Sequence, residues 1–383
     1  MTEGSFESLL EEIKKGMKGE NLWIPLRYPS LRNHVGITKR LYHLVGGDPG
    51  TGKTAFVDQT YVLDAHQFAN YSDNVNIKTL YFSMERSQVY KKAKWLTHRM
   101  YLQNSILRSV NDILSFGTAN HEMTDQMLAV AESHKDYFEG LFDDVRVIDG
   151  SNNPTGVYKI MYKFALTHGT IYGRDEKGKY YKITRSSWSE SNPDKRHIYI
   201  TRAECPIELK QPYDREYVPD DEDLILQVIV DHIGKVTSES GLNKKGTLDK
   251  VSSYFSLCRD LFGMNIVVIQ QFNRNNANIQ RRINTDLTPE QQDFKDSGNT
   301  YEDADVVLGL FNPYKHGLST YKGFNIKKTK QNGFSRFRSV TLMKNSYGVD
   351  NLIAAFKFVG ECGYFEQLTE QGDTLNYEET FNV

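Results

Sequence analysis

Near its N-terminus the chain reads Gly47-Asp48-Pro49-Gly50-Thr51-Gly52-Lys53-Thr54, which matches the pattern G-x-x-x-x-G-K-[ST] in full. Chance gives such a match in a chain of this length only on the order of one time in a hundred. An apolar segment over residues 41–45 leads into this run, and a helical pattern over about residues 53–70 leads out of it. A strand, a glycine-rich loop and a helix in this order are typical of a phosphate-binding loop, because backbone N–H groups and the helix N-terminus both face the anion. We therefore assign the whole run to the binding of nucleotide phosphates.

The two residues that end this loop have side chains suited to Mg-ATP. We expect Lys53 to reach the β- and γ-phosphates and the hydroxyl of Thr54 to coordinate Mg²⁺. A buried strand predicted over residues 224–230 ends in Asp231, at the sheet edge where ligands bind in such folds. Asp231 is therefore expected to hold the same Mg²⁺ through water.

Hydrolysis also requires a carboxylate that activates water, and Glu85 is the best placed one. It directly follows a strand predicted over residues 79–83, so it too lies at the carboxyl edge of the sheet. The alternative is that Glu85 caps the next helix, near Ser83. We favour the catalytic interpretation.

The composition is that of a globular protein. Of the 383 residues, 39% are hydrophobic and 25% are charged, and the net charge is −2. This net charge does not predict nucleic-acid binding, which would have to rest on a local basic surface. No stretch approaches the roughly 20 apolar residues of a membrane span, and the N-terminus lacks a signal-peptide pattern. The cysteines, Cys205, Cys258 and Cys362, suit neither a disulfide framework nor a zinc site, which favours a cytoplasmic protein without a membrane partner.

The rest of the chain alternates short apolar runs with helical patterns. Further strands are predicted over residues 145–148, 265–269 and 306–310, and further helices over residues 88–101 and 248–262. This alternation predicts an α/β fold with a mostly parallel sheet and helices on both faces.

Two segments depart from this alternation. Residues 339–343 and 352–358 flank a turn and predict a C-terminal β-hairpin at a sheet edge. Residues 170–217 are rich in tyrosines and charges, and we interpret them as a β-rich insertion. The aromatic residues of this insertion either stack on nucleic-acid bases or belong to a solvent-exposed subdomain or a partner contact, and we favour the latter pair.

The first residues, 1–22, are predicted to form a linker-type segment with an amphipathic helix over residues 5–18. Residues 23–383 are predicted to form one ATPase domain that carries the insertion. The helix has an apolar stripe, which packs either on its own domain or on a neighbouring subunit. The stripe consists of Phe6, Leu9, Leu10, Ile13 and Met17.

Further motifs resemble the ATPase domain of DnaB-type hexameric replicative helicases, which has a RecA-like P-loop core, from about residue 25 to residue 365. Phe82-Ser83-Met84-Glu85 resembles the family's F-S-L-E, and Gln271-Phe272-Asn273-Arg274 resembles its Q-L-N-R. Val230-Asp231-His232 lies where the family has its Walker B aspartate and a following aromatic residue. Lys295-Asp296-Ser297-Gly298 and residues 302–307 resemble R-E-S-G and Q-D-A-D-V-V. Order and spacing agree as well as residue type.

This resemblance implies ATP and Mg²⁺ as cofactors and gives two side chains a role in hydrolysis. It makes Glu85 the catalytic base. It makes Gln271 the sensor of the γ-phosphate, which couples hydrolysis to loops that bind DNA.

The resemblance also implies single-stranded DNA as a partner. It places Lys295, Asp296 and Gly298 in a loop that faces the central channel of a ring and grips the DNA backbone. Arg281 and Arg282 either add positive charge to this channel or lie in a solvated surface loop.

The chain departs from the family where a neighbouring subunit would complete the ATP site. The family's K-x-R-x-G segment supplies a Lys and an Arg in trans, whereas this chain keeps Lys344 and has Ser346 in place of the arginine. Such an arginine is worth several powers of ten in rate, so either Lys344 acts alone or an arginine from elsewhere substitutes. By period 2, Arg336 and Arg338 share a strand face with Lys344, but Arg338 would lie roughly 20 Å away along a straight strand.

A second departure lies at the N-terminus. Only about twenty residues precede the core, so the family's helical collar domain is expected to be absent. Primase and loader proteins remain candidate partners by resemblance, with no contact residue assigned. A helicase without a collar would suit a phage replication system acting in the host cytoplasm.

Three hypotheses follow, and the first is favoured. The chain is an ATP-driven helicase and translocase on single-stranded DNA, assembled as a homo-hexamer. Alternatively, it is a RecA-like recombinase that forms filaments on DNA. In the third hypothesis the loss of the arginine makes it a slow nucleotide switch or a scaffold in a larger assembly.

Overall fold

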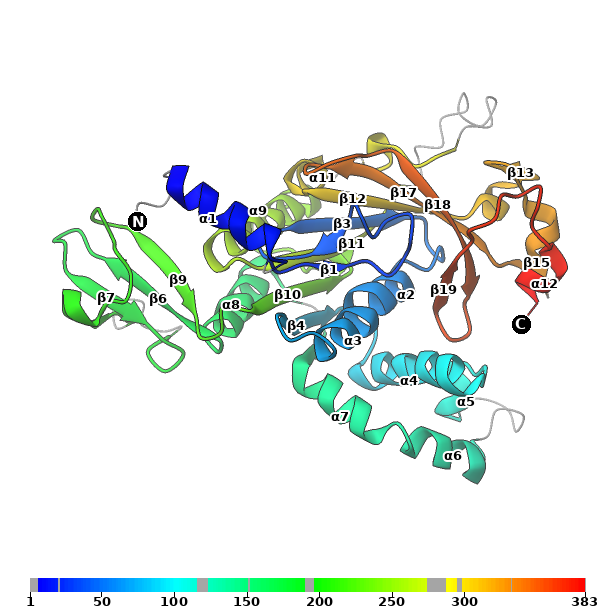
Figure 1. The fold of residues 1–383 in the computed structure, drawn as a ribbon, viewed down its shortest axis with the longest axis horizontal. Helices are drawn as coiled ribbons and strands as arrows, with labels where there is room; N and C mark the ends of the chain where they lie inside the picture. Colours follow the sequence, from blue (N-terminus) through cyan, green and yellow to red (C-terminus); the bar gives the residue numbers. More distant parts are fainter. Residues whose placement is uncertain are drawn as a thin grey trace.

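The computed structural model describes residues 6–19, 21–115, 123–150, 152–189, 196–273, 287–294, 298–331 and 333–382. A nine-stranded sheet forms the centre of the molecule (Figure 1). Six neighbouring strands of this sheet are parallel. In spatial order they are β5 (Val145–Asp149), β4 (Asn76–Ser83), β10 (Leu224–Asp231), β11 (Asn265–Gln271), β3 (Tyr42–Gly47) and β12 (Val306–Phe311).

Three antiparallel strands continue the sheet beyond β12. They are β17 (Phe337–Asn345), β18 (Leu352–Val359) and β19 (Tyr364–Gln367). The predicted C-terminal hairpin is confirmed as the pair β17 and β18. It does not lie at the very edge of the sheet, because β19 pairs with β18 and forms the edge itself.

Helices cover both faces of the sheet, as predicted. Strand β10 is buried along its whole length and sends alternate side chains to opposite faces, so its sequence is continuously apolar. Ile225 and Ile229 join the cluster on one face, and Leu226 and Val228 join the cluster on the other. The first face is covered by α2 (Lys53–Val57), α3 (Asp64–Asn70), α4 (Gln88–Asn104) and α7 (Lys135–Asp144), and the second by α8 (Pro154–Ala165) and α9 (Lys244–Phe262).

The helix that follows the phosphate loop is continuous but changes its winding. Between α2 and α3, residues Asp58–Leu63 form a π-helical segment, and all six of these residues are buried. The predicted helix over residues 53–70 therefore exists with its expected ends. Its interior turns Asp58 toward the core of the protein.

A separate four-stranded antiparallel sheet lies at one end of the molecule (Figure 1). It contains β6 (Gly169–Arg174), β7 (Tyr180–Ile183), β8 (Ile198–Tyr199) and β9 (Arg215–Pro219). Two aromatic residues of this segment, Tyr181 and Trp188, are buried, whereas Tyr199 and Tyr213 are exposed. Burial removes Tyr181 and Trp188 from the residues that could stack on bases.

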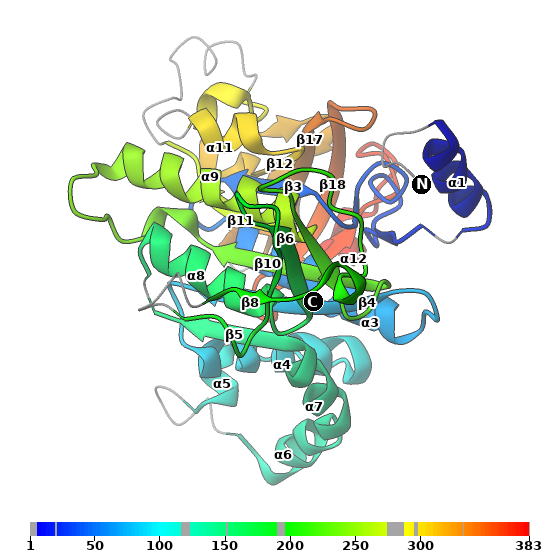
Figure 2. The ribbon, with the colours of Figure 1, turned by 90° about the vertical axis from the view of Figure 1, so that its left-hand side faces the viewer.

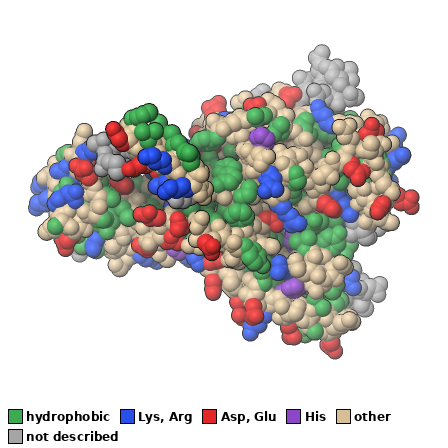
Figure 3. All heavy atoms as spheres, viewed as in Figure 1, with side chains coloured by type: hydrophobic (Ala, Val, Ile, Leu, Met, Phe, Trp, Pro, Cys, Tyr) green, Lys and Arg blue, Asp and Glu red, His purple; other side chains and the backbone are tan. Residues whose placement is uncertain are grey.

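Helix α1 (Phe6–Met17) presents its apolar stripe to solvent. Its five apolar side chains are between 38% and 84% exposed. The helix stands away from the sheet (Figure 2), and its hydrophobic side chains form an uncovered group on the surface (Figure 3). In this structure the stripe is therefore not covered by the chain's own core.

Smaller elements complete the described part of the chain. They are β1 (Ile24–Pro25), β2 (Gly36–Ile37), α5 (Val110–Ile113), α6 (Asp125–Glu132), α11 (Gly298–Asp303), β13 (Thr320–Tyr321), β14 (Phe324–Asn325), β15 (Lys330–Gln331), β16 (Phe334–Ser335) and α12 (Tyr377–Phe381).

One geometric expectation about β17 is wrong. The register between β12 and β17 shifts at Val307/Leu308, where Lys344 pairs with Val307 and Leu342 pairs with Leu308. The extra residue breaks the period-2 alternation, since a bulge inserts one residue into a single strand. Arg338 and Lys344 therefore do not share a face by simple alternation, and Arg336 precedes the strand.

Candidate nucleotide-binding site

The carboxyl ends of the parallel strands meet at one edge of the sheet and form a cavity. Strands β3, β4, β10 and β11 all end there, because parallel neighbours run in the same direction. The cavity has a volume of about 390 Å³. It is lined by Pro49, Gly50, Gly52, Lys53, Thr54, Ala55, Asp58, Glu85, Arg86, Tyr90, Lys91, Lys94, Asp231, His232, Ile269 and Gln271. The sequence-predicted residues for nucleotide phosphates, Mg²⁺ and catalysis are thus brought together, with the exception of Lys344.

The loop from Gly47 to Thr54 has a backbone that requires glycine. Gly50 and Gly52 have positive φ angles of 73° and 98°. A Cβ atom on Gly52 would also lie 2.9 Å from the ring of Phe365, so a larger residue would clash with the core. The hydroxyl of Thr51 donates to the carbonyl oxygen of Asp48 at 2.8 Å and closes the turn. These contacts hold the loop in the shape that a phosphate group requires.

Lys53 lies inside the loop. Its ammonium donates to the carbonyl oxygens of Gly47 and Asp48, both at 2.8 Å. Burial lowers the pKa of Lys53 to about 8, although Asp48, Asp231 and Glu85 oppose this shift. A bound phosphate would bring further negative charge to the ammonium and favour its charged form.

Thr54 and Asp231 are the oxygen donors that suit Mg²⁺. The hydroxyl of Thr54 donates to Oδ1 of Asp231 at 3.0 Å. Mg²⁺ prefers hard oxygen ligands and keeps several waters, so one hydroxyl and one carboxylate beside a phosphate site fit this ion. Together they would hold Mg²⁺, which supplies charge neutralisation for the phosphates.

Glu85 contacts a histidine rather than capping a helix. Its Oε1 lies 3.1 Å from Nε2 of His232, and Nδ1 of His232 accepts the N–H of Gly234. Because Nδ1 is an acceptor, a neutral imidazole carries its proton on Nε2 and donates it to Glu85. The cap of α4 is Ser87, which accepts from the backbone of Tyr90, so the capping alternative for Glu85 is wrong.

Gln271 lies beside the same histidine. Its side-chain nitrogen is 3.3 Å from Nε2 of His232, so Glu85, His232 and Gln271 form one contact chain across the cavity. Burial lowers the pKa of His232, although Glu85 and Asp231 oppose the shift. The sequence placed His232 after the Walker B aspartate but assigned it no role.

Lys344 lies outside the cavity lining of its own chain. Its ammonium donates to the carbonyl oxygens of Glu302 at 2.9 Å and Tyr301 at 3.4 Å. Arg338 instead reaches its own phosphate loop, where its guanidinium donates to the carbonyl oxygen of Thr51 at 3.1 Å. Burial lowers the pKa of Arg338 to about 10. Arg338 therefore supports the loop from behind.

The residues predicted to bind DNA are placed only in part. Arg281, Arg282, Lys295 and Asp296 lie outside the described residues. Gly298 is the first residue of α11.

Helix α11 is tied to the strand that carries Gln271. The buried hydroxyl of Thr300, in α11, donates to Oε1 of Gln270 at 2.8 Å. The helix after the predicted DNA-binding loop is thus bonded to the residue that precedes Gln271.

Sequence reasoning missed three further groups around the loop. Lys315 donates to the carbonyl oxygen of Pro49 at 2.7 Å, and Nε2 of His316 lies 2.8 Å from the carboxylate of Asp48. The third group is Lys91, which bonds to Asp231 at 3.0 Å. No local pattern marked Lys315 or His316, whereas Lys91 was detectable as a charged residue on the buried face of an amphipathic helix.

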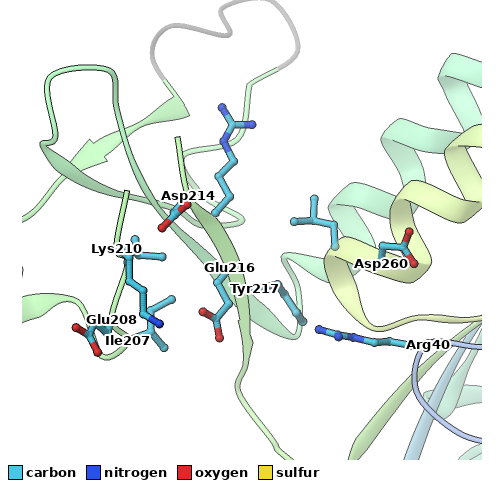
Figure 4. Close-up of a pocket in the computed structure, with 11 residues that line it drawn as sticks. Arg40, Ile207, Glu208, Lys210, Asp214, Glu216, Tyr217 and Asp260 are labelled. Carbon is cyan, nitrogen blue, oxygen red and sulfur yellow. The ribbon is translucent and has the colours of Figure 1, made fainter. Parts of the chain in front are cut away.

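A larger hollow lies between β9 and α9, with a volume of about 700 Å³. Figure 4 shows Arg40 extending from the core toward Tyr217 and Glu216 on β9. Acidic and basic side chains are mixed there, and the side chains assigned to ATP chemistry lie in the other cavity. This hollow therefore adds nothing to the nucleotide site.

Within the described residues, no helix combines the length and apolar character that crossing a membrane requires.

The fold and the cavity together define a RecA-like P-loop ATPase core. No protein-family model matches the sequence, and no curated protein matches it either. Among solved structures, the chain is similar to an isolated ATPase domain, with 14% identity and a TM-score of 0.61 over 96% of this chain and 100% of that one. It is also similar to a DnaB-like replicative helicase described with its interactions with primase, with 13% identity and a TM-score of 0.57 over 95% of this chain and 67% of that one. The fold is therefore the one found in the ATPase domains of replicative helicases.

Proposed function

We propose that this protein is an ATP-dependent translocase on single-stranded DNA and works as a replicative helicase. The observation that carries the proposal is the meeting of Lys53, Thr54, Glu85, Asp231 and Gln271 in one cavity. Each of these side chains has a task in phosphoryl transfer, in which positioning and charge stabilisation supply most of the catalysis. ATP and Mg²⁺ are the proposed cofactors.

In the proposed mechanism, the described residues prepare ATP for attack by water. Lys53 and the loop backbone bind the phosphates, and Thr54 and Asp231 hold the metal. Glu85 takes a proton from the attacking water, and the N–H of His232 keeps the Glu85 carboxylate oriented. Gln271 reports the presence of the γ-phosphate to the strand β11.

The bond between Gln270 and Thr300 offers a route from the ATP site to DNA. A change at Gln271 moves the neighbouring Gln270, which is bonded to α11. The loop that precedes α11 contains Lys295 and Asp296, the residues proposed to grip the DNA backbone. Gly298 begins the helix, and Arg281 and Arg282 are proposed to add positive charge nearby.

A ring is the proposed assembly, most simply a homo-hexamer. The exposed stripe of α1 is suited to dock on a second copy of the chain, because apolar side chains gain from leaving water. Lys344 is proposed to enter the ATP site of the neighbouring subunit, since it lies outside the cavity lining of its own chain. A cytoplasmic location and contacts with primase or a loader protein belong to the same proposal.

The decisive measurement is steady-state ATP hydrolysis with and without single-stranded DNA. Stimulation by DNA that disappears in Glu85→Gln, with ATP binding retained, would support the motor. A rate near background in both conditions, unchanged by DNA, would refute it.

A slow nucleotide switch or scaffold is the second candidate, and the observation that favours it is Ser346 in the position of the expected arginine. Single-turnover hydrolysis separates the two, because a switch would hydrolyse bound ATP slowly and without stimulation by DNA. A RecA-like recombinase would instead form filaments on DNA, which electron microscopy distinguishes from rings.

A further inference from the structure

A lysine from the middle of α4 lies directly behind the proposed metal site. Lys91 is 2% exposed, and its ammonium donates to Oδ2 of Asp231 at 3.0 Å. The same ammonium donates to the hydroxyl of Tyr81 at 2.8 Å and lies 3.4 Å from both carboxylate oxygens of Asp58. Its partners therefore come from the helix after the phosphate loop, from β4 and from β10.

The charges of this group are balanced only when the residues are taken together. The side chains of Asp58 and Asp231 are 5% and 4% exposed, so both carboxylates are as buried as the ammonium. An isolated charge in such a place would be very costly. Burial disfavours the charged form of Lys91, but Asp58 and Asp231 more than offset it, so its pKa is raised.

The bonds to Asp231 fix both of its carboxylate oxygens. Oδ1 accepts from Thr54 at 3.0 Å, and Oδ2 accepts from Lys91 at 3.0 Å and from Tyr81 at 3.3 Å. The terminal torsion of a free aspartate is broad, so without these donors the carboxylate would sample many orientations. Lys91 is also closer to Asp231 than to Asp58, which argues against a simple ion pair between α4 and the helix of Asp58.

We infer that Lys91 is a positioning residue that holds the Asp231 carboxylate in the orientation that binds Mg²⁺, with Asp58 as the counter-charge that makes a buried lysine tolerable. Partners of metal ligands commonly have this role, and their loss costs about 10- to 100-fold in metal affinity or activity. The inference rests on the proposed ATPase function, because that function assigns the metal to Asp231.

The test uses the double variant Asp58→Asn/Lys91→Met. Removing one partner alone would leave an unpaired buried charge, whereas removing both charges of a buried pair is often neutral for stability. The first readout is the affinity for Mn²⁺ in the presence of ADP, measured by electron paramagnetic resonance, which requires no hydrolysis. The second is the Mg²⁺ concentration that gives half-maximal ATP hydrolysis.

We expect the double variant to bind Mn²⁺ about 10-fold more weakly and to need correspondingly more Mg²⁺. Metal-free binding of ATP should stay within about twofold, since the loop and Lys53 are intact. The matched control is Lys78→Met/Asp144→Asn, which removes a lysine–aspartate pair between β4 and α7 outside the cavity. Its metal affinity should not change.

A folded double variant with the Mn²⁺ affinity of the wild type would overturn the inference and leave Lys91 as part of a structural ion pair. If the double variant does not fold, Tyr81→Phe replaces it, because it removes only the hydroxyl that Lys91 and Asp231 share. Weaker Mn²⁺ binding at an unchanged Tm then supports positioning, and unchanged binding refutes it. Loss of hydrolysis by the wild type itself, with Mn²⁺ binding intact, would count against the proposed function and not against Lys91.

Discussion

The hydroxyl of Thr54 donates a 3.0 Å hydrogen bond to Oδ1 of Asp231, although 177 positions separate the two residues in the chain. The bond joins the first turn of α2 to the end of β10. It shows that both proposed metal-binding oxygens lie side by side in the folded chain. Little rearrangement is then needed for Mg²⁺ to bind between them and the phosphates.

Replacing Thr54 by Ala should nearly abolish hydrolysis, because Mg²⁺ would lose one protein oxygen. We expect kcat to fall by at least about 100-fold, equivalent to roughly 3 kcal/mol of transition-state stabilisation. Steady-state hydrolysis over a series of Mg²⁺ concentrations measures this loss. Thr97→Ala, which removes a hydroxyl that bonds within α4, is the control and should keep the wild-type rate. A Thr54→Ala protein as active as its control would remove Thr54 from the metal site.

Lys344→Ala should lower kcat while leaving ATP binding unchanged, because Lys344 lies outside the cavity of its own chain. We expect a loss of at least about tenfold, as for a group that stabilises transition-state charge in trans. Mixing Lys344→Ala with Glu85→Gln checks the arrangement. In a random one-to-one mixture, about one quarter of the interfaces combine an intact Glu85 with an intact Lys344 from the neighbour.

The mixture should therefore be more active than the two variants measured separately and added. Activity equal to that sum would mean that Lys344 does not act across an interface.

Charges placed on the stripe of α1 should prevent ring assembly without unfolding the monomer. Leu9 and Ile13 are 52% and 49% exposed, so Leu9→Glu/Ile13→Glu removes few contacts within the chain. Each of these side chains is worth about 1.5–3 kcal/mol when fully buried, so assembly should weaken by at least about tenfold. Light scattering after size-exclusion chromatography measures the assembly, and calorimetry measures the Tm of the monomer.

The control for this pair is Lys14→Glu/Lys18→Glu, which changes charge outside the stripe. The prediction is wrong if both double variants assemble equally well.

Asp64→Asn should stabilise the protein above about pH 6. Burial raises the pKa of Asp64 to about 6, against the attraction of Arg27, so the folded state holds a proton more tightly than the unfolded state. Stability from this group is fully present below the unfolded pKa and is lost as the pH rises through 6. The variant avoids this loss, so its free energy of unfolding should exceed that of the wild type at pH 7.5 by up to about 3 kcal/mol.

Urea unfolding at several pH values tests this prediction, with Asp73→Asn, an exposed acid, as the control. The advantage of Asp64→Asn should shrink toward pH 4. A constant difference across the pH range would contradict the burial argument.

Much of this architecture follows from local patterns. The glycines at positions 50 and 52 and the apolar run before them predict the phosphate loop, because each feature depends on residues that are neighbours in the chain. The alternation of apolar runs and helical patterns likewise predicts the parallel sheet with helices on both faces. Glu85 and Asp231 were found because each directly follows a strand, and strand ends of a parallel sheet share one edge.

The structure corrected expectations where a single inserted residue or a distant contact decides the geometry. The shift of register opposite Val307 separates Lys344 from Arg338, and no sequence pattern marks it. The contact of His232 with Glu85 spans 147 positions and depends on how β4 and β10 pair.

The sequence by itself determined that this protein has a phosphate loop, a parallel sheet and acids at its carboxyl edge, since spacing along the chain encodes all three. Only the tertiary structure decided that Lys91, Asp58 and Tyr81 surround Asp231 and that the stripe of α1 stays exposed. The physical reason is that charge pairing and burial depend on distances through space. Those distances exist only after segments far apart in the sequence have packed against one another.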